Sequence, residues 1–393
     1  MKIKEFLFMA LTALIFLSSG CGGGGSNIAI QSESLKILSS MTLKEKVGQL
    51  IVIQPDQLTL QVEEYTVQNS AARGKTELDS EMLEALKNYP VGGFIFQSDN
   101  IDTAEQVKAF TKALKDACKI FPFIAIDEEG GVVSRLGRGP FSADIPKVGT
   151  VKEIGDTGDT QNAFNAANTI GSYIKEYGFN FDFAPVADVI SDDIPNNPIN
   201  RLNRSFGTDP ELVSQMAGAF LEGLHSQDVA GSLKHFPGHG ATSGDTHEGY
   251  VALNKTWDEL LECDLIPFIK NFEKTDCIMT AHITLLNVTS DGLPATLSKE
   301  ILTDKLRNEL GYDGILITDA MNMGAIREHY SSGEAALLAL EAGNDILLMP
   351  YNYKAAFNAV LDAVNSGRIS EERLNESVLR ILALKLKLKE QQN

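Results

Sequence analysis

Eight short apolar runs recur along the chain, and a longer segment with the apolar spacing of a helix follows each of them. The runs are rich in β-branched residues, which is typical of buried strands. Eight alternations of strand and helix predict a parallel sheet closed into a single (β/α)8 barrel, with an open doubly wound sheet as the alternative. The expected strands are residues 47–53, 92–96, 121–126, 179–186, 230–233, 277–281, 314–318 and 345–349.

The segments between these runs carry helix signals. Asp209 offers a cap and Pro210 an early proline before an amphipathic stretch that ends near His225. Residues 370–389 have the pattern of a final amphipathic helix on the outside of the barrel. No low-complexity linker or run of like charge interrupts the chain after about Met41. We therefore expect one domain over residues 35–393.

The N-terminus has the layout of a secretory signal: Lys2 and Lys4, an apolar run over residues 6–17, and small residues before Cys21. The run is too short to span a bilayer comfortably. The layout resembles a bacterial lipoprotein processing site, although Leu17 stands one position earlier than is usual. We expect a signal peptide over 1–20, a lipidated Cys21 with a flexible tether over 21–34, and a protein anchored to a bacterial membrane on its periplasmic or cell-surface face. Plain secretion is the alternative.

Charge and cysteine content exclude several classes of partner. A formal net charge of −19 without a basic stripe argues against a nucleic-acid partner, because phosphate contacts require clustered Lys and Arg. Apart from Cys21, the cysteines are Cys118, Cys263 and Cys277, an odd number without CxxC spacing. This pattern implies neither a disulfide framework nor a zinc–thiolate site, so we expect buried free thiols.

Polar residues stand at the expected carboxyl ends of several strands, where (β/α)8 barrels place their active sites. For any single one, capping the next helix is an equally good explanation. Seven together are hard to explain as caps and indicate a functional site at one rim. These residues are Asp127, Glu128, Asp188, Lys234, His235, His282 and Asp319.

The densest motif covers residues 234–249, where glycine and proline predict a loop. Its three histidines lack the paired spacing of common zinc sites, so we expect no metal and no cofactor. Asp245 stands two residues before His247. A carboxylate so placed orients the imidazole and supports its protonated form, which makes the pair a candidate general acid/base. The alternative is an exposed loop histidine without a task.

This loop resembles the signature of family 3 glycoside hydrolases, specifically the bacterial β-N-acetylhexosaminidases. Residues 41–50, 92–96, 127–131, 203–207 and 317–321 resemble further motifs of the family in the same order. The resemblance runs from about residue 35 to 388. It implies a retaining hydrolase that releases terminal β-linked N-acetylglucosamine from cell-wall or other glycan fragments through a covalent glycosyl-enzyme.

The resemblance also implies roles for individual residues. Asp319 would attack the anomeric carbon, and His247, with Asp245 as its partner, would protonate the leaving oxygen and later activate water. We expect the glycine-rich loop to close over bound sugar. The residues implied to hold the terminal sugar are Asp127, Arg135, Arg204, Lys234 and His235.

Three other functions remain as alternatives. A β-glucosidase-type hydrolase of the same family would take its acid/base carboxylate from a second domain, whereas this chain carries the histidine loop. Phosphate could replace water, which would give a phosphorolytic N-acetylglucosaminidase. A sugar-binding lipoprotein would lack Asp319, Asp245 or His247, and all three are present. Glu128 and Val132 stand where Gln and Arg are common in the family, which leaves the fine specificity open.

Overall fold

A computed structural model describes residues 24–59, 74–247 and 249–391. Its centre is an eight-stranded sheet in the order β11-β9-β7-β6-β3-β2-β1-β12, and a parallel bridge between Ile317 and Ile346 joins its two ends. Every pairing in this sheet is parallel, so the predicted (β/α)8 barrel is confirmed. The barrel strands are β1 (Ile51–Ile53), β2 (Gly93–Phe96), β3 (Phe123–Ile126), β6 (Phe181–Asp182), β7 (Ala230–Phe236), β9 (Cys277–Thr280), β11 (Ile315–Thr318) and β12 (Leu347–Leu348).

Each barrel strand lies within or overlaps one of the eight apolar runs. The first run is too long at its start, because its first three residues belong to helix α3 (Leu43–Gln49). Thr42 and Glu45 form a capping box that starts this helix. Two small sheets flank the barrel: the hairpin β4 (Glu128–Gly130) with β5 (Val133–Ser134), and the pair β8 (Val251–Leu253) with β10 (Ile283–Leu285).

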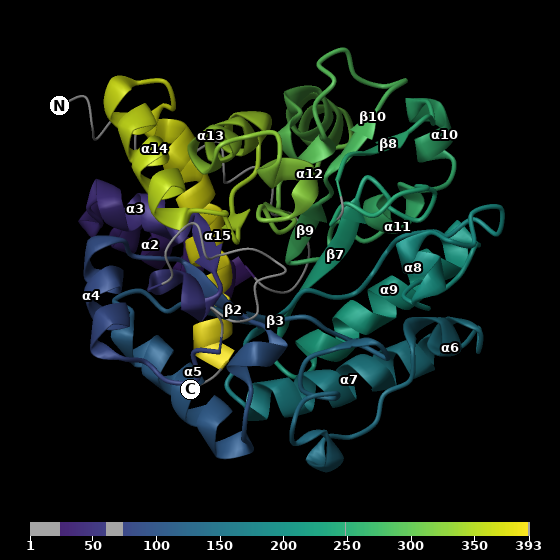
Figure 1. Ribbon diagram of the computed structural model, residues 1–393, viewed down its shortest axis with the longest axis horizontal. Helices are drawn as coiled ribbons and strands as arrows, with labels where there is room; N and C mark the ends of the chain where they lie inside the picture. The colour runs from purple at the N-terminus through teal and green to yellow at the C-terminus, as the bar shows by residue number, and fades with distance from the viewer. Residues whose placement is uncertain (1–23, 60–73, 248, 392–393) are drawn as a thin grey trace.

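Helices surround the strands on all sides in Figure 1. The predicted helix start at Asp209 is confirmed: the Asp209 carboxylate accepts from the Glu211 amide at 3.0 Å and caps α9 (Pro210–His225). The other helices are α4 (Ser80–Asn88), α5 (Ala104–Ala117), α6 (Val151–Gly155), α7 (Thr160–Glu176), α8 (Pro198–Arg201), α10 (Trp257–Leu261), α11 (Ile266–Ile269), the π-helix η8 (Glu300–Glu309), α12 (Gly324–Arg327), α13 (Ser332–Ala342) and α14 (Tyr353–Ser366), with 3-10 turns η2 (Pro55–Leu58), η5 (Ser98–Asn100), η6 (Ser142–Asp144) and η7 (Ala295–Leu297).

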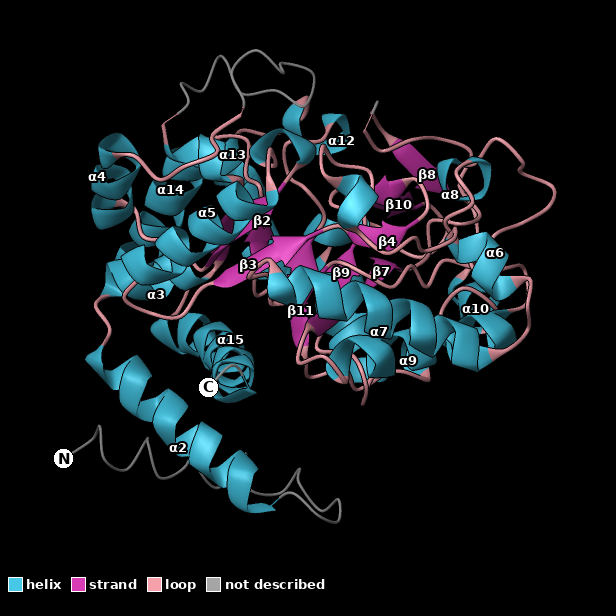
Figure 2. Ribbon diagram, turned by 90° about the horizontal axis from the view of Figure 1, so that it is seen from below, coloured by secondary structure: helices cyan, strands magenta, loops and turns pink. Residues whose placement is uncertain are grey.

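The final helix α15 (Glu371–Gln391) forms as predicted, but it closes one end of the barrel where a position on the outside was expected. Ile381, Leu384 and Leu388 belong to the apolar cluster that fills the barrel interior. Lys385 donates to the carbonyl of Gly92 at 2.6 Å, directly before β2. The helix therefore covers the N-terminal ends of the strands, below the sheet in Figure 2.

Helix α2 (Gly24–Ser40) packs against α15 on this same side. Residues 24–34 are thus helical where a flexible tether was expected, and the buried side chains of Ser34 and Leu38 give the segment a packing face. The expected signal peptide and Cys21 lie outside the described residues. No helix within the described ranges is both long and apolar enough to cross a membrane.

The three described cysteines are free thiols. Cys277 is buried, whereas Cys118 and Cys263 are partly exposed, so the expectation of buried thiols holds fully for one of them.

Candidate active site

The parallel barrel brings the carboxyl ends of its strands to one mouth, on the side opposite α15. Asp127 directly follows β3, and Asp319 directly follows β11. Lys234 and His235 lie in the last part of β7, and His282 stands two residues after β9. The rim predicted from the sequence is therefore present.

Glu128 differs from the other rim residues, because its fully buried carboxylate has a structural role. It accepts from the backbone amides of Arg135, Leu136 and Gly137 at 2.7 to 3.0 Å and from the Tyr173 hydroxyl at 2.9 Å. These bonds hold the segment after hairpin β4–β5 and so position Arg135.

Glu129, which is not among the residues predicted for the site, lies at the centre of an ionic cluster. Its carboxylate accepts two hydrogen bonds from Arg204, at 2.8 and 2.7 Å, and Lys234 Nζ lies 2.6 Å from Oε1. Lys234 also reaches Asp127 at 3.1 Å, and Arg135 contacts the other oxygen of Asp127 at 3.3 Å. Side chains alternate along an extended segment, so Asp127 and Glu129 share a side that Glu128 does not. The alternation of side chains over residues 127–129 was the sequence signal that Glu129 lies on the same side as Asp127.

The cluster favours the charged forms of Asp127, Glu129, Lys234 and Arg204. Burial alone would raise the pKa of Asp127, but Lys234 and Arg135 outweigh it and hold this pKa below its usual value. Burial also opposes ionisation of Glu129, yet Arg204 and Lys234 hold its pKa well below the usual range. Conversely, the carboxylates outweigh burial and raise the pKa values of Lys234 and Arg204.

Asp188 orients His235 and the start of the histidine loop. Its carboxylate contacts His235 Nδ1 at 2.7 Å and accepts from the backbone amide of His239 at 2.6 Å. Burial would raise the pKa of Asp188, but His235 and His239 hold it below its usual value. Nδ1 of His235 is thus engaged by Asp188, and the ring has a fixed orientation.

The histidine loop is braced near its start, and Asp245 and His247 contact each other further along. Asn197 donates to the carbonyls of His239 and Thr242, both at 2.8 Å. Asp245 Oδ1 lies 2.7 Å from Nδ1 of His247 and also accepts from the backbone amide of His247 at 3.0 Å. The predicted dyad is therefore formed in the structure.

The side chain of His247 is 58% exposed. Its hydrogen bond to Asp245 outweighs partial burial and raises the pKa of the imidazole, while the same bond lowers the pKa of Asp245 to about 2. The dyad thus favours a protonated imidazole next to an ionised carboxylate.

Asp319 is held by backbone contacts on both sides. Its amide donates to the carbonyl of Thr280 at 2.9 Å, and its Oδ1 accepts from the amide of Ala320 at 2.7 Å. Burial would raise its pKa, whereas the imidazoles of His282, His235 and His247, when protonated, and the Ala320 amide lower it. Asp319 is therefore an ionised carboxylate at neutral pH.

The loop reaches the segment after Asp319 through two backbone contacts. The amide of Gly324 donates to the carbonyl of His247 at 3.4 Å, and the amide of Ala325 donates to the carbonyl of Thr246 at 3.3 Å. Both amides lie in the first turn of α12. The dyad and Asp319 thus share one side of the mouth, although the imidazole itself faces solvent.

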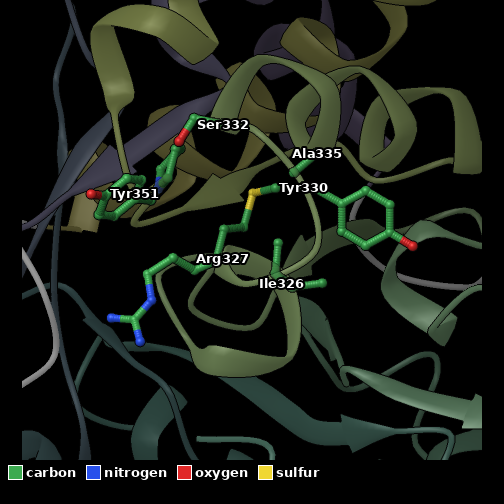
Figure 3. Close-up of a pocket in the computed structure, with 8 residues that line it drawn as sticks. Ile326, Arg327, Tyr330, Ser332, Ala335 and Tyr351 are labelled. Atoms are coloured by element: carbon green, nitrogen blue, oxygen red, sulfur yellow. The ribbon is translucent and has the colours of Figure 1, made fainter. Parts of the chain in front are cut away.

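A recess lies beside this segment, between the residues that follow β11 and those that follow β12. Figure 3 shows Tyr330 and Tyr351 on opposite sides of it, with Ile326 between them. Its lining residues are Met321, Ile326, Arg327, Tyr330, Ser332, Ala335, Pro350 and Tyr351.

No cluster of three His, Cys, Asp or Glu side chains that could hold a metal ion occurs among the residues described above. The histidines of the mouth have other partners instead. His235 contacts Asp188, His247 contacts Asp245, and His282 contacts Thr296.

Comparison with known proteins gives a consistent set of similarities. The N-terminal domain of glycosyl hydrolase family 3 matches residues 42–384. Beta-hexosaminidase A of Pseudoalteromonas piscicida is 33% identical over 342 residues, which cover 80% of this chain and 56% of that protein. Beta-hexosaminidase of Tolumonas auensis is 34% identical over 292 residues, which cover 74% of this chain and 84% of that protein.

A solved structure is similar along most of the chain. The family 3 β-N-acetylglucosaminidase of Paenibacillus sp. FPU-7 superposes with a TM-score of 0.79 at 35% sequence identity. The match covers 89% of this chain and 63% of that protein.

Proposed function

This chain belongs to glycosyl hydrolase family 3, and we propose that it releases terminal β-linked N-acetylglucosamine from cell-wall or other glycan fragments with retention at the anomeric carbon. The observation that carries the proposal is an ionised Asp319 at the same barrel mouth as the Asp245–His247 dyad. The names of the similar proteins, beta-hexosaminidase and β-N-acetylglucosaminidase, support the substrate class.

In the first half of the reaction, a carboxylate oxygen of Asp319 forms a bond to the anomeric carbon. The bond from that carbon to the leaving oxygen breaks, and protonated His247 gives its proton to this oxygen. The product is a covalent glycosyl-enzyme. The hydrogen bond from the Ala320 amide and the lowered pKa of Asp319 support this role, because both favour the deprotonated carboxylate.

In the second half, water attacks the anomeric carbon, and neutral His247 accepts a proton from this water. The ester bond to Asp319 breaks, which restores the carboxylate and the protonated imidazole. Asp245 supports both steps because it holds the ring by Nδ1 and leaves Nε2 as the atom that exchanges the proton.

Closure of the histidine loop completes the site in this proposal. The imidazole of His247 is more than half exposed, so proton transfer requires the loop to move inward over bound sugar. The brace at Asn197 supports such a motion of the far part of the loop, because it fixes the near part at residues 239 and 242.

The terminal sugar is held by Asp127, Arg135, Arg204, Lys234 and His235 in this proposal. Four of them belong to the ionic cluster of Asp127 and Glu129, and His235 follows Lys234 in β7, which supports a shared binding role. Arg135 Nε is buried without a hydrogen-bond partner among the described residues, which supports its use as a donor to a sugar hydroxyl or acetamido oxygen.

We further propose that the protein is exported and anchored to a bacterial membrane by a lipid on Cys21. The sequence of the first 21 residues supports this proposal. In this proposal, α2 packs against α15 on the side of the barrel opposite the mouth.

A panel of aryl β-glycosides that differ at the 2-position tests the substrate class. We expect the acetamido sugar to be cleaved with the highest kcat/KM, with release of free N-acetylglucosamine at the same rate with and without phosphate. A preference for a 2-hydroxyl would favour the β-glucosidase-type alternative. Release of a sugar 1-phosphate would favour the phosphorolytic one.

A further inference from the structure

His282 is a rim histidine to which the proposed reaction gives no task. It stands two residues after β9 and only 1% of it is exposed. Nε2 lies 3.1 Å from the carbonyl oxygen of Ala320, and Nδ1 lies 2.9 Å from Oγ1 of Thr296. Both ring nitrogens are therefore engaged inside the protein, and one of them contacts the residue directly after Asp319.

The partners of the ring fix its tautomer. A carbonyl oxygen only accepts hydrogen bonds, so Nε2 must carry the proton that it shares with Ala320. The single proton of the Thr296 hydroxyl can go to Nδ1 or to the Thr280 carbonyl, which is 2.9 Å away, and a neutral ring requires that it go to Nδ1. Burial lowers the pKa of His282, in agreement with a neutral ring.

The contact to Ala320 completes a series of bonds along the backbone of the candidate nucleophile. The Asp319 amide is bound to Thr280, and the Ala320 amide donates to the Asp319 carboxylate. The next amide, that of Met321, donates to the carbonyl of Leu348 at 2.9 Å. The Ala320 carbonyl also accepts from the amide of Met323 at 3.0 Å, so His282 is its second donor. Without His282, this carbonyl would keep only the backbone bond, and the turn directly after Asp319 would gain freedom to shift.

His282 is itself held by a second layer of buried polar groups. Oγ1 of Thr296 lies 2.9 Å from the carbonyl of Thr280, and Asn344 donates to the Thr296 carbonyl at 2.8 Å. The Thr280 hydroxyl donates to Oδ1 of Asn344 at 3.0 Å. All three residues are fully buried, so the ring has a rigid support that leads back to β9, the strand beside Asp319.

We propose that His282 is a positioning residue for the nucleophile: its Nε2–H holds the Ala320 carbonyl and thereby fixes the Asp319 carboxylate for attack. This inference rests on the proposed function of Asp319. His282 does not exchange protons with the substrate, because neither of its nitrogens is free. The inference predicts that the geometry of the Nε2–H donor, rather than the bulk of the ring, determines the rate of glycosyl transfer.

Two substitutions separate these contributions. In His282→Gln, the side-chain Nε2–H₂ group occupies the position of the histidine Nε2 and can still donate to Ala320. In His282→Asn, the amide reaches only the position of Nδ1 and the Ala320 contact is lost. In both variants the Thr296 hydroxyl can donate to the Thr280 carbonyl instead.

We expect His282→Asn to lower kcat on an aryl N-acetyl-β-glucosaminide on the order of 100-fold with little change in KM, because a small misplacement of a reacting group has this effect. His282→Gln should retain most of the kcat. Circular dichroism and thermal melting identify variants that fold. The proposal would be overturned if folded His282→Gln and His282→Asn proteins had equal kcat values. It would also be overturned if His282→Asn lost kcat/KM through a higher KM alone.

A second measurement does not depend on activity. The ¹⁵N chemical shifts of the His282 ring in the wild-type protein report its tautomer, and we expect a neutral ring protonated at Nε2 between pH 6 and about 8, near and above the ordinary histidine pKa. An Nδ1–H tautomer or an imidazolium in this range would refute the inference. Lack of hexosaminidase activity in a wild type that has the expected tautomer would count against the proposed function instead.

Discussion

The carboxylate of Glu129 holds the guanidinium of Arg204 through two parallel hydrogen bonds, 2.8 Å from Nε to Oε2 and 2.7 Å from Nη2 to Oε1. The same carboxylate binds Lys234, so one acidic side chain with 1% exposure sets the position of two cations at the barrel mouth. Glu129 therefore organises the proposed sugar site without belonging to the residues that the family resemblance identifies.

Replacement of Glu129 by Gln should leave Arg204 and Lys234 buried without their shared counter-charge. Breaking a buried pair in this way costs about 3 to 5 kcal/mol of stability. We also expect KM for the aryl N-acetylglucosaminide to rise, because both cations lose their fixed positions. Urea unfolding and steady-state kinetics measure the two effects. Glu222→Gln is the control, because its exposed pair with Lys274 contributes about 1 kcal/mol or less.

Asp319→Ala should abolish release of the aryl group, because no other carboxylate replaces the nucleophile at the end of β11. Asp313→Ala is the control, since that residue is exposed and precedes the same strand. Initial rates at neutral pH measure the effect. Near-normal turnover in a folded Asp319→Ala protein would rule out the assigned nucleophile.

His247→Ala should affect substrates according to their leaving groups. Protonation of the leaving oxygen contributes on the order of 10²- to 10⁴-fold, and it matters most for alkoxide-like leaving groups. We therefore expect a large loss of kcat/KM with poor leaving groups and a small loss with nitrophenol. A plot of log(kcat/KM) against leaving-group pKa should become steeper. Equal losses for both kinds of substrate would contradict the acid role.

Asp245→Asn should shift the pH profile. The hydrogen bond from Asp245 raises the pKa of His247, and a general acid acts in its protonated form, so the wild type keeps activity to higher pH. Loss of the carboxylate charge lowers this pKa. The alkaline limb of kcat/KM should therefore move to lower pH in the variant, while the acid limb, which reports Asp319, stays in place. An unchanged alkaline limb would show that the protonation of His247 does not determine this limb of the pH profile.

Asp345→Asn should destabilise the protein, because the Asp345 carboxylate holds side chains of the C-terminal helix α15. The buried carboxylate is 2.8 Å from Arg307 and 3.3 Å from Arg380, and the Ser377 hydroxyl also donates to it. We expect a loss of about 3 to 5 kcal/mol, because the arginines stay behind without this partner. Asp313→Asn, which alters an exposed partner of Arg380, should cost far less. Chemical denaturation of the three proteins compares them.

The sequence was sufficient to predict the barrel, because buried parallel strands leave an apolar signature that polar loops interrupt. It failed at residues 47–49, where a capping box turned an apolar run into the end of a helix. It also missed the helix over residues 24–34, since the packing of α2 on α15 depends on a partner almost 350 positions away in the chain.

Part of the site could be predicted from the positions of residues relative to the expected strands. Position at the end of a strand indicates which residues reach the mouth, and this placed Asp127, Lys234, His235 and Asp319 correctly at the rim. It does not indicate the direction of a side chain in the turn that follows. Glu128 was therefore assigned to the rim although it braces a hairpin, and Glu129 was overlooked.

The proposed nucleophile and the proposed proton carrier lie on different parts of the chain. Asp319 follows a barrel strand, whereas Asp245 and His247 lie together in one loop. Asp245 and His247 could therefore be transplanted together as one cassette, residues 237–250, into another barrel of the same family. The recipient would need counterparts of Asp188 and Asn197, which hold the fixed end of the loop. If the proposed roles hold, proton transfer could be exchanged in this way without redesign of the proposed nucleophile.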